Sequence, residues 1–248
     1  MKTSESTPEP RTNPTHSRYA PRRQWLATVL ALPLLTLAWS LGACRSAFAA
    51  DTPVPPTVSA LDSAAMAMFD AGETRDWAAA SAALVRAKNA ARDVAQLQTI
   101  YVTSGGTLEH FFEVQNNLRS DLMEADTATS VQDQRWLVRA ADHLVTRAGE
   151  LSEPFKPRHN SILPRVETLL FLARRMRRAR VSQDANDYAD ASATFGQLWS
   201  ALRHDLPASA ASQATALEQA LSGMGASSTS ADIRKFYLAV ATLRDAVS

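Results

Sequence analysis

The sequence predicts an all-α fold, a bundle of stacked antiparallel αα-hairpins with about seven to eight helices. Apolar residues recur at spacings of three and four along most of residues 58–248, and clusters of glycine, proline and short polar residues separate these stretches. No segment shows the strict apolar–polar alternation that is typical of a half-buried strand. We therefore expect a single all-helical domain over residues 58–248.

The first two helices are expected on either side of residues 70–72. A helical apolar face runs from Val58 to Phe69, and the Asp-Ala-Gly segment that follows is predicted to end it. The second helix should begin near Thr74, and its apolar face is rich in alanine, which allows neighbouring helices to approach closely. The Ser-Gly-Gly segment at 104–106 is the clearest turn in the chain.

The middle of the domain is expected to hold two more helices. The first spans about residues 107–125 and is broken by the polar cluster at 126–130, which offers an N-cap for the next helix. That helix, with Asp133 in its first turn, carries an apolar face over residues 136–151. Three prolines mark residues 152–163 as the longest internal loop.

Proline and glycine also bound the last helices. Pro164 suits the start of a fifth helix, and a sixth should run from about Gln183 to a point before Pro207. An Ala/Ser-rich, weakly amphipathic helix is expected over residues 210–221, and Ser230 is predicted to cap the final one.

A faint internal repeat supports the hairpin arrangement. Residues 76–81 (DWAAAS) align with 187–192 (DYADAS), and Asp133 with Trp136 lies roughly midway between them. Each copy places an aromatic residue after an acidic residue, as expected for the second helix of an αα-hairpin. The match is too loose for a named repeat.

Residues 1–50 precede this domain and have the order of an export signal, a basic segment followed by a Leu-rich uncharged run. Arg22 and Arg23, followed by Trp25-Leu26, resemble a twin-arginine signal, although Pro21 and Ala27 depart from its usual pattern. The resemblance implies export to the periplasm of a bacterial envelope.

Three fates of this leader remain open. The small-x-small spacing of Ala47 and Ala49 favours ordinary cleavage, after which residues 51–57 would form a Pro-rich linker. Residues 41–44 resemble a lipobox, in which Cys44 would be acylated and anchor the protein to the membrane. The run over residues 25–43 is also nearly long enough to remain as an uncleaved anchor, which takes about 20 apolar residues. We favour ordinary cleavage, which leaves no transmembrane segment.

Composition narrows the classes of function. The full chain has 26 basic and 25 acidic side chains, and 20 and 23 of these remain once residues 1–50 are removed. The basic excess therefore belongs to the leader and does not indicate a nucleic-acid partner. Because Cys44 is the only cysteine, the domain has no disulfide and no thiolate metal site.

One set of polar residues has the chemistry of a metal site. His110 and Glu113 lie on a stripe of the helix over 107–125, and His143 lies on the next helix. Imidazole and carboxylate ligands suit Zn²⁺ or Cu²⁺, but the order His-x-x-Glu is the reverse of the bundle di-metal motif and occurs once. A solvated helix face is the preferred interpretation, and no cofactor is predicted. A periplasmic metal-binding bundle is the alternative function.

The strongest local anomaly is a run of cations between residues 156 and 180. Arg174, Arg175, Arg177 and Arg178 form its densest part, and Glu167 is the only acid within it. Acids at 184, 187 and 190 open the next helix and are available to neutralise part of the charge. The preferred function is a non-enzymatic binding or accessory protein of the cell envelope, in which these arginines engage an envelope protein or an anionic membrane or cell-wall component.

The leader generates the first testable prediction. Intact mass of the exported protein should give a chain that begins at Ala50 or Asp51, because signal peptidase cuts after small-x-small. A Cys44→Ala variant should mature normally. Blocked maturation of that variant would show that the lipobox is used, and a retained leader on most molecules would contradict both forms of processing.

Overall fold

The computed structural model describes residues 53–156, 160–225 and 228–248, all of which belong to one compact unit over residues 48–248. These residues form helices and connecting turns, with no strand among them, which confirms the predicted all-α class. The leader residues singled out above lie outside the described part of the chain: Arg22, Arg23, Cys44, Ala47 and Ala49. No helix within the described ranges has the length and apolar character needed to cross a membrane.

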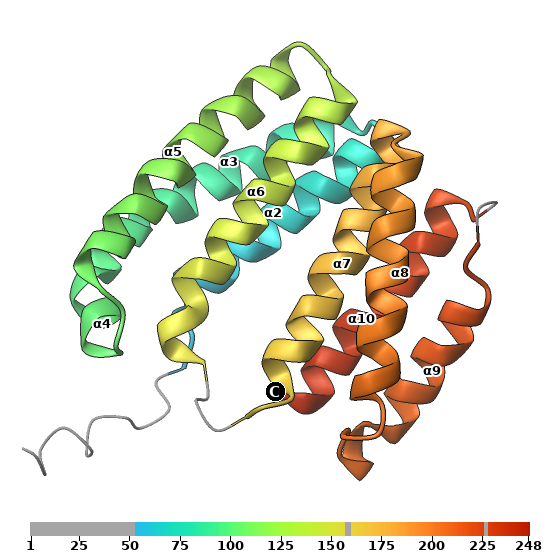
Figure 1. The fold of residues 1–248 in the computed structure, drawn as a ribbon. Coiled ribbons are helices and arrows are strands. Elements are labelled where there is room, and N and C mark those ends of the chain that lie inside the picture. The colour runs from blue at the N-terminus through green and yellow to red at the C-terminus, as the bar shows by residue number, and fades with distance from the viewer. Residues whose placement is uncertain (1–52, 157–159, 226–227) are drawn as a thin grey trace, which may run out of the picture. The chain divides into compact units, whose positions relative to one another are not determined.

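Figure 1 shows the helices in chain order. They are α2 (Pro56–Thr74), α3 (Trp77–Val94), α4 (Gln98–Thr103), α5 (Leu108–Ser130), α6 (Gln134–Ser152), α7 (Leu163–Ser182), α8 (Ala185–Leu202), α9 (Ala211–Ser222) and α10 (Ser230–Val247), with short 3₁₀ turns at Ala95–Leu97, Glu153–Phe155 and Ala208–Ala210.

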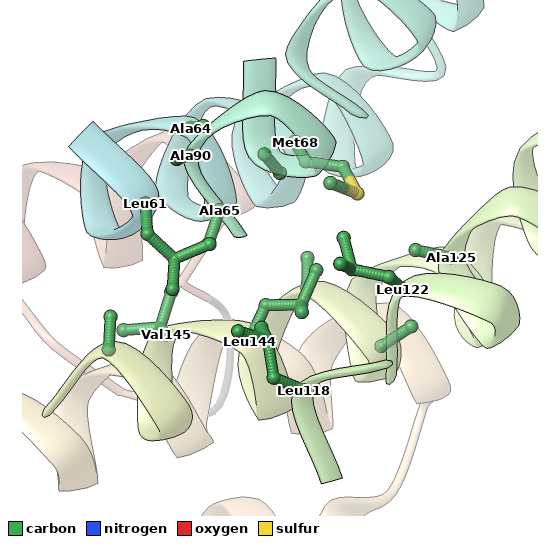
Figure 2. Close-up of a cluster of buried hydrophobic side chains, with 14 of the residues drawn as sticks. Leu61, Ala64, Ala65, Met68, Ala90, Leu118, Leu122, Ala125, Leu144 and Val145 are labelled. Atoms are coloured by element: carbon green, nitrogen blue, oxygen red, sulfur yellow. The ribbon is translucent and has the colours of Figure 1, made fainter. Parts of the chain in front are cut away.

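The first hydrophobic core lies among α2, α3, α5 and α6. Helix α2 packs against both α3 and α6, and α6 also packs against α5. Figure 2 shows how this core is filled, with Met68, Leu118 and Leu144 meeting between the helices. Alanines such as Ala65 and Ala125 are fully buried beside them and let the helix backbones approach closely.

A second core lies among α7, α8, α9 and α10. Its centre is an edge-to-face pair of Phe195 and Phe236, whose ring centroids are 4.7 Å apart. Trp199 and Leu202 of α8 and Val240 of α10 complete it. Met66 of α2 packs against both cores, and the Tyr237 hydroxyl lies 3.4 Å from its sulfur, so the two cores adjoin along α2, α7 and α10.

Three helix–helix corners share one local structure. The α2–α3, α5–α6 and α7–α8 corners each have a left-handed residue followed by an aspartate N-cap, and the left-handed residues are Arg75, Gln132 and Gln183. The amide after each left-handed residue donates to a carbonyl five residues earlier, as in a Schellman motif. Asp184 is thus the counterpart of Asp76 and Asp133, which corrects the sequence alignment that had matched Asp187 to Asp76.

Neighbouring corners also contact one another. Arg75 Nε donates to Gln134 Oε1 at 3.0 Å, and Arg135 Nη2 donates to Gln183 Oε1 at 3.3 Å. The three corners therefore line up along one edge of the described unit, and Figure 1 shows them at the same end of the helices.

Several predicted boundaries need correction. Helix α2 does not end at residues 70–72, because Gly72 lies inside the helix where an added Cβ would be 2.9 Å from Val138 Cγ2 of α6. Helix α5 continues through 126–130, where the hydroxyls of its Thr and Ser residues donate to carbonyls of the preceding turn instead of capping a new helix. Helix α2 already starts at Pro56, inside the expected linker, and α10 is capped by Thr229 through a capping box with Asp232.

Candidate functional site

The structure places the four predicted partner-binding arginines at the junction of the two cores. Arg174 and Arg177 are buried, and Arg177 is 1% exposed, the largest fully buried side chain of the described residues. Arg175 and Arg178 are partly exposed. Two of the four arginines therefore point into the domain, and their role in binding a partner stays a prediction.

Arg177 is held by both carboxylates and aromatic rings. Its guanidinium contacts Glu73 through a bidentate pair, with Nε to Oε1 at 3.0 Å, and Nη2 is 2.5 Å from Asp70 Oδ1. Its Cζ lies 4.7 Å from the centroid of Phe69 and 4.8 Å from that of Tyr237. Burial opposes the charge on Arg177, but Glu73 and Asp70 outweigh burial and keep its pKa above the usual value.

Asp142 of α6 is the second anchor of the junction. Its carboxylate is almost fully buried and accepts from Arg174 Nε and, at 2.7 Å, from Arg178 Nη1. Arg174 Nη2 also reaches the Thr146 hydroxyl at 3.4 Å. Two arginines of α7 thus converge on one carboxylate of α6, which supplies counter-charge from the other core.

The remaining negative charge near these arginines comes from aspartates of α8, which the sequence places at the start of this helix. Arg175 Nε donates to Asp187 Oδ1 at 2.7 Å, and Arg175 lies 3.5 Å from Asp190. Arg178 also lies 3.5 Å from Asp187, whereas Asp184 serves as the α8 N-cap. Whether the exposed parts of Arg175 and Arg178 contact a partner stays a prediction.

The candidate metal ligands fall into two separate pairs. His110 Nδ1 lies 3.5 Å from Glu113 on an exposed part of α5, and His143 Nδ1 lies 3.5 Å from Asp121. Within the described residues, no three His, Cys, Asp or Glu side chains are placed to share a metal ion. The structure therefore does not bring His110, Glu113 and His143 together.

The pair of His143 and Asp121 is electrostatically coupled. Asp121 is nearly buried and also accepts from Arg147 Nε at 3.0 Å. Burial of Asp121 opposes its ionisation, but the hydrogen bonds from His143 and Arg147 outweigh burial and lower its pKa. The hydrogen bond to Asp121 raises the pKa of His143, against a smaller effect of burial.

A groove of about 890 Å³ lies beside this pair, between α6 and the α7–α8 corner. Its lining residues come from the first half of α6, the end of α7 and the start of α8: Asp133, Arg135, Trp136, Arg139, His143, Arg178, Ser182, Asp184 and Asp187. The acidic members already have partners, because Asp133 and Asp184 cap helices and Asp187 pairs with arginines.

Two cations of the groove lack such partners. Arg135 and Arg139 are exposed on the same ridge of α6, one turn apart, and neither pairs with a carboxylate of the described chain. Trp136 lies between them in sequence, and its indole Nε1 is buried with no hydrogen-bond acceptor among the described residues. The groove thus presents positive charge and an aromatic side chain at the corner edge.

Sequence reasoning missed Arg135 and Arg139 because they are two cations among mixed charges, whereas α7 offered a dense run. The available signal was their i,i+4 spacing, with Asp142 as the single acid at the neighbouring i±3 or i±4 positions. Asp142 turns inward to α7, which leaves the ridge positive.

Comparisons with known proteins supply no assignment. No family model matches the chain, and neither a curated protein nor a solved structure matches it.

The buried junction yields a prediction about stability. An Arg177→Gln change should lower the free energy of unfolding by about 3–5 kcal/mol, because it leaves the Glu73 carboxylate buried without its partner. The double change Arg177→Met and Glu73→Leu should recover most of the loss, since it removes both charges. Urea unfolding measures both, with the exposed Arg86→Gln as the matched control, expected within about 0.5 kcal/mol of the parent. A loss below about 1 kcal/mol in Arg177→Gln would contradict the assigned role.

The coupled pair on α5 and α6 yields a prediction about pH. The raised pKa of His143 stabilises the folded state below the usual histidine value of 6.5, and this stabilisation is lost as pH rises through the higher folded pKa. The lowered pKa of Asp121 stabilises the folded state above the usual aspartate value of 3.8, and this stabilisation is lost as pH falls through the lower folded pKa. A His143→Gln variant should therefore be less stable than the parent at pH 5.5, by less than about 1 kcal/mol because the imidazole is half-exposed, and should match it near pH 9. His204→Gln is the control, and an equal loss at both pH values would rule out the ionic contribution.

Proposed function

We propose that this protein is an exported, non-enzymatic binding or accessory protein of the cell envelope, which engages an anionic partner through the groove at the α6–α7–α8 corner. The observation that carries the proposal is the pair Arg135 and Arg139, exposed on one ridge of α6 without carboxylate partners. Arg178 lines the same groove and belongs to the basic run that the sequence singled out.

Electrostatics support this location over the buried arginines. The charge of Arg174 and Arg177 is already matched by Asp142, Glu73 and Asp70, so an external anion would have to displace a desolvated ion pair. The side chains of Arg135 and Arg139 are exposed to solvent, and like charges at i,i+4 spacing repel each other. An anion between them removes that repulsion and gains two charge-assisted contacts.

Export rests on the sequence of residues 1–50 and remains part of the proposal. So does the arrangement as stacked antiparallel hairpins, which the shared corner structure at Arg75, Gln132 and Gln183 supports. The groove offers positive charge and an aromatic side chain, which suit recognition of a phosphate or carboxylate surface such as a phospholipid headgroup, a cell-wall polymer or an acidic protein segment.

The test is a double change in the groove. The variant Arg135→Gln/Arg139→Gln should bind phosphatidylglycerol vesicles about 30-fold more weakly than the parent, since each arginine near an anionic surface contributes about 1 kcal/mol. Binding of the parent should also fall when NaCl rises from about 50 to 300 mM. Cosedimentation measures both effects.

The matched control is Arg86→Gln/Arg119→Gln, which removes two exposed arginines of α3 and α5 outside the groove. It should bind as the parent does. Equal weakening in both double variants would show that net charge alone matters, and binding of polyglutamate but not of vesicles, still dependent on Arg135 and Arg139, would assign an acidic protein partner instead of a lipid surface.

A further inference from the structure

A second hollow lies on the other side of the junction and has a different chemistry. This cleft, of about 600 Å³, is bounded by α2, α6, α7 and α10, and it lies between the two hydrophobic cores. Its volume is in the range of sites that hold small organic molecules, which often lie where two packed units meet. It shares no lining residue with the groove of the proposed function.

Apolar atoms make up most of the surface of the cleft. Val58 of α2, Val145 of α6 and Leu170 of α7 face it from three helices, and Phe155 closes it from the turn after α6. Phe171 also lines it and is 42% exposed, unusually high for a phenylalanine beside a core. An apolar body placed in the cleft would cover this ring.

Asp62 is the one charged side chain of the cleft wall that makes no ion pair within the described residues. The other charged side chains that line the cleft are matched: Lys156 with Glu153 and Glu167, Arg174 with Asp142, and Arg244 with Asp245. Asp62 makes no hydrogen bond to a described residue either, although it is only partly accessible to solvent.

The environment of Asp62 leaves its charge under-compensated. Burial raises its pKa, and the more distant Arg244 and Arg174 only partly oppose that effect. A cation that reached Asp62 would supply the missing partner. An anion would instead find Arg174 and Arg244 already engaged, and would face Asp62, Glu167 and Asp245.

We propose that this cleft binds an amphipathic organic cation, whose apolar body lies between α2, α6 and α7 and whose ammonium group pairs with the Asp62 carboxylate. The Ser59 hydroxyl also lines the cleft and can accept a further hydrogen bond from the ammonium. The proposal is independent of the anionic partner, since the two sites have different lining residues and opposite ligand charge.

The experiment uses three fluorescent probes that share one apolar body. Dansylcadaverine carries an ammonium group, dansylamide is neutral and dansylglycine carries a carboxylate. We expect saturable enhancement of dansylcadaverine fluorescence on titration of the purified protein, with weaker binding of dansylamide and the weakest binding of dansylglycine. No saturable binding of dansylcadaverine up to about 1 mM, about −4 kcal/mol, would overturn the proposal.

Two variants locate the site. Asp62→Asn should weaken dansylcadaverine binding at least tenfold, a loss of about 1.4 kcal/mol, and leave dansylamide binding unchanged. It should not lower the denaturation midpoint, because no native ion pair is broken. Gly149→Phe should block all three probes, since Gly149 lines the cleft and an added Cβ meets no atom within 4 Å, so the ring can occupy the cleft without a clash at its base.

The matched control is Gly196→Phe, because a Cβ at Gly196 of α8 also meets no atom within 4 Å and Gly196 does not line the cleft. It should bind dansylcadaverine as the parent does. Probe binding that survives both Asp62→Asn and Gly149→Phe would place the amine elsewhere and overturn the proposal, as would tighter binding of dansylglycine than of dansylcadaverine. Loss of vesicle binding in the groove variant with probe binding intact would separate this site from the proposed function.

Discussion

The contact between Arg177 and Glu73 is the constraint on which the arrangement of the two cores depends. It joins α7 to α2 across 104 residues of sequence and places a guanidinium, 1% exposed, between the rings of Phe69 and Tyr237. A buried charge is tolerated only where partners are fixed close to it, so this position defines how α7 and α10 lie against α2. The hydrophobic cores fill each half, while the ion pairs determine where the halves meet.

Much of the fold could be predicted from local sequence. Spacing of apolar residues located the long helices, and the turn at 104–106 was predicted because turn chemistry acts over a few residues. The cap of α6 was placed in the cluster at 126–130, whereas the structure has Asp133 as its N-cap. Boundary errors arose where tertiary packing or side-chain hydrogen bonds override propensity. Gly72 suggested a helix end but permits close packing of α6, and the hydroxyls of Thr127 and Ser130 bond to carbonyls inside α5 instead of capping a new helix.

The candidate site was harder to predict, for a physical reason. A run of arginines without nearby acids indicates an exposed basic face, unless carboxylates distant in sequence approach it. Here Asp70, Glu73 and Asp142 approach from α2 and α6, and only the three-dimensional structure reveals them. Asp142 is next to His143 in sequence, and nothing in this local context indicates that its carboxylate is buried against α7.

Asp142 also connects the two hollows of the domain. Arg174, which lines the cleft, and Arg178, which lines the groove, donate to its two carboxylate oxygens. A ligand that shifts either guanidinium therefore changes the counter-charge available to the other. The two proposed sites are separate in their lining residues but share one buried acid.

The left-handed corners carry a further consequence for sequence change. Glycine is the usual residue at such positions, since other residues cost roughly 1 kcal/mol there, and replacement by glycine commonly relaxes the backbone. At Arg75 and Gln183 the side chain is what bonds to the adjacent corner, through Gln134 and Arg135. Gln132 makes no such bond among the described residues. Replacement by glycine at Gln132 therefore breaks no bond between corners. At Arg75 and Gln183 it would relax the backbone but remove a side-chain hydrogen bond to the neighbouring corner. The three corners have the same conformation but tolerate different residues.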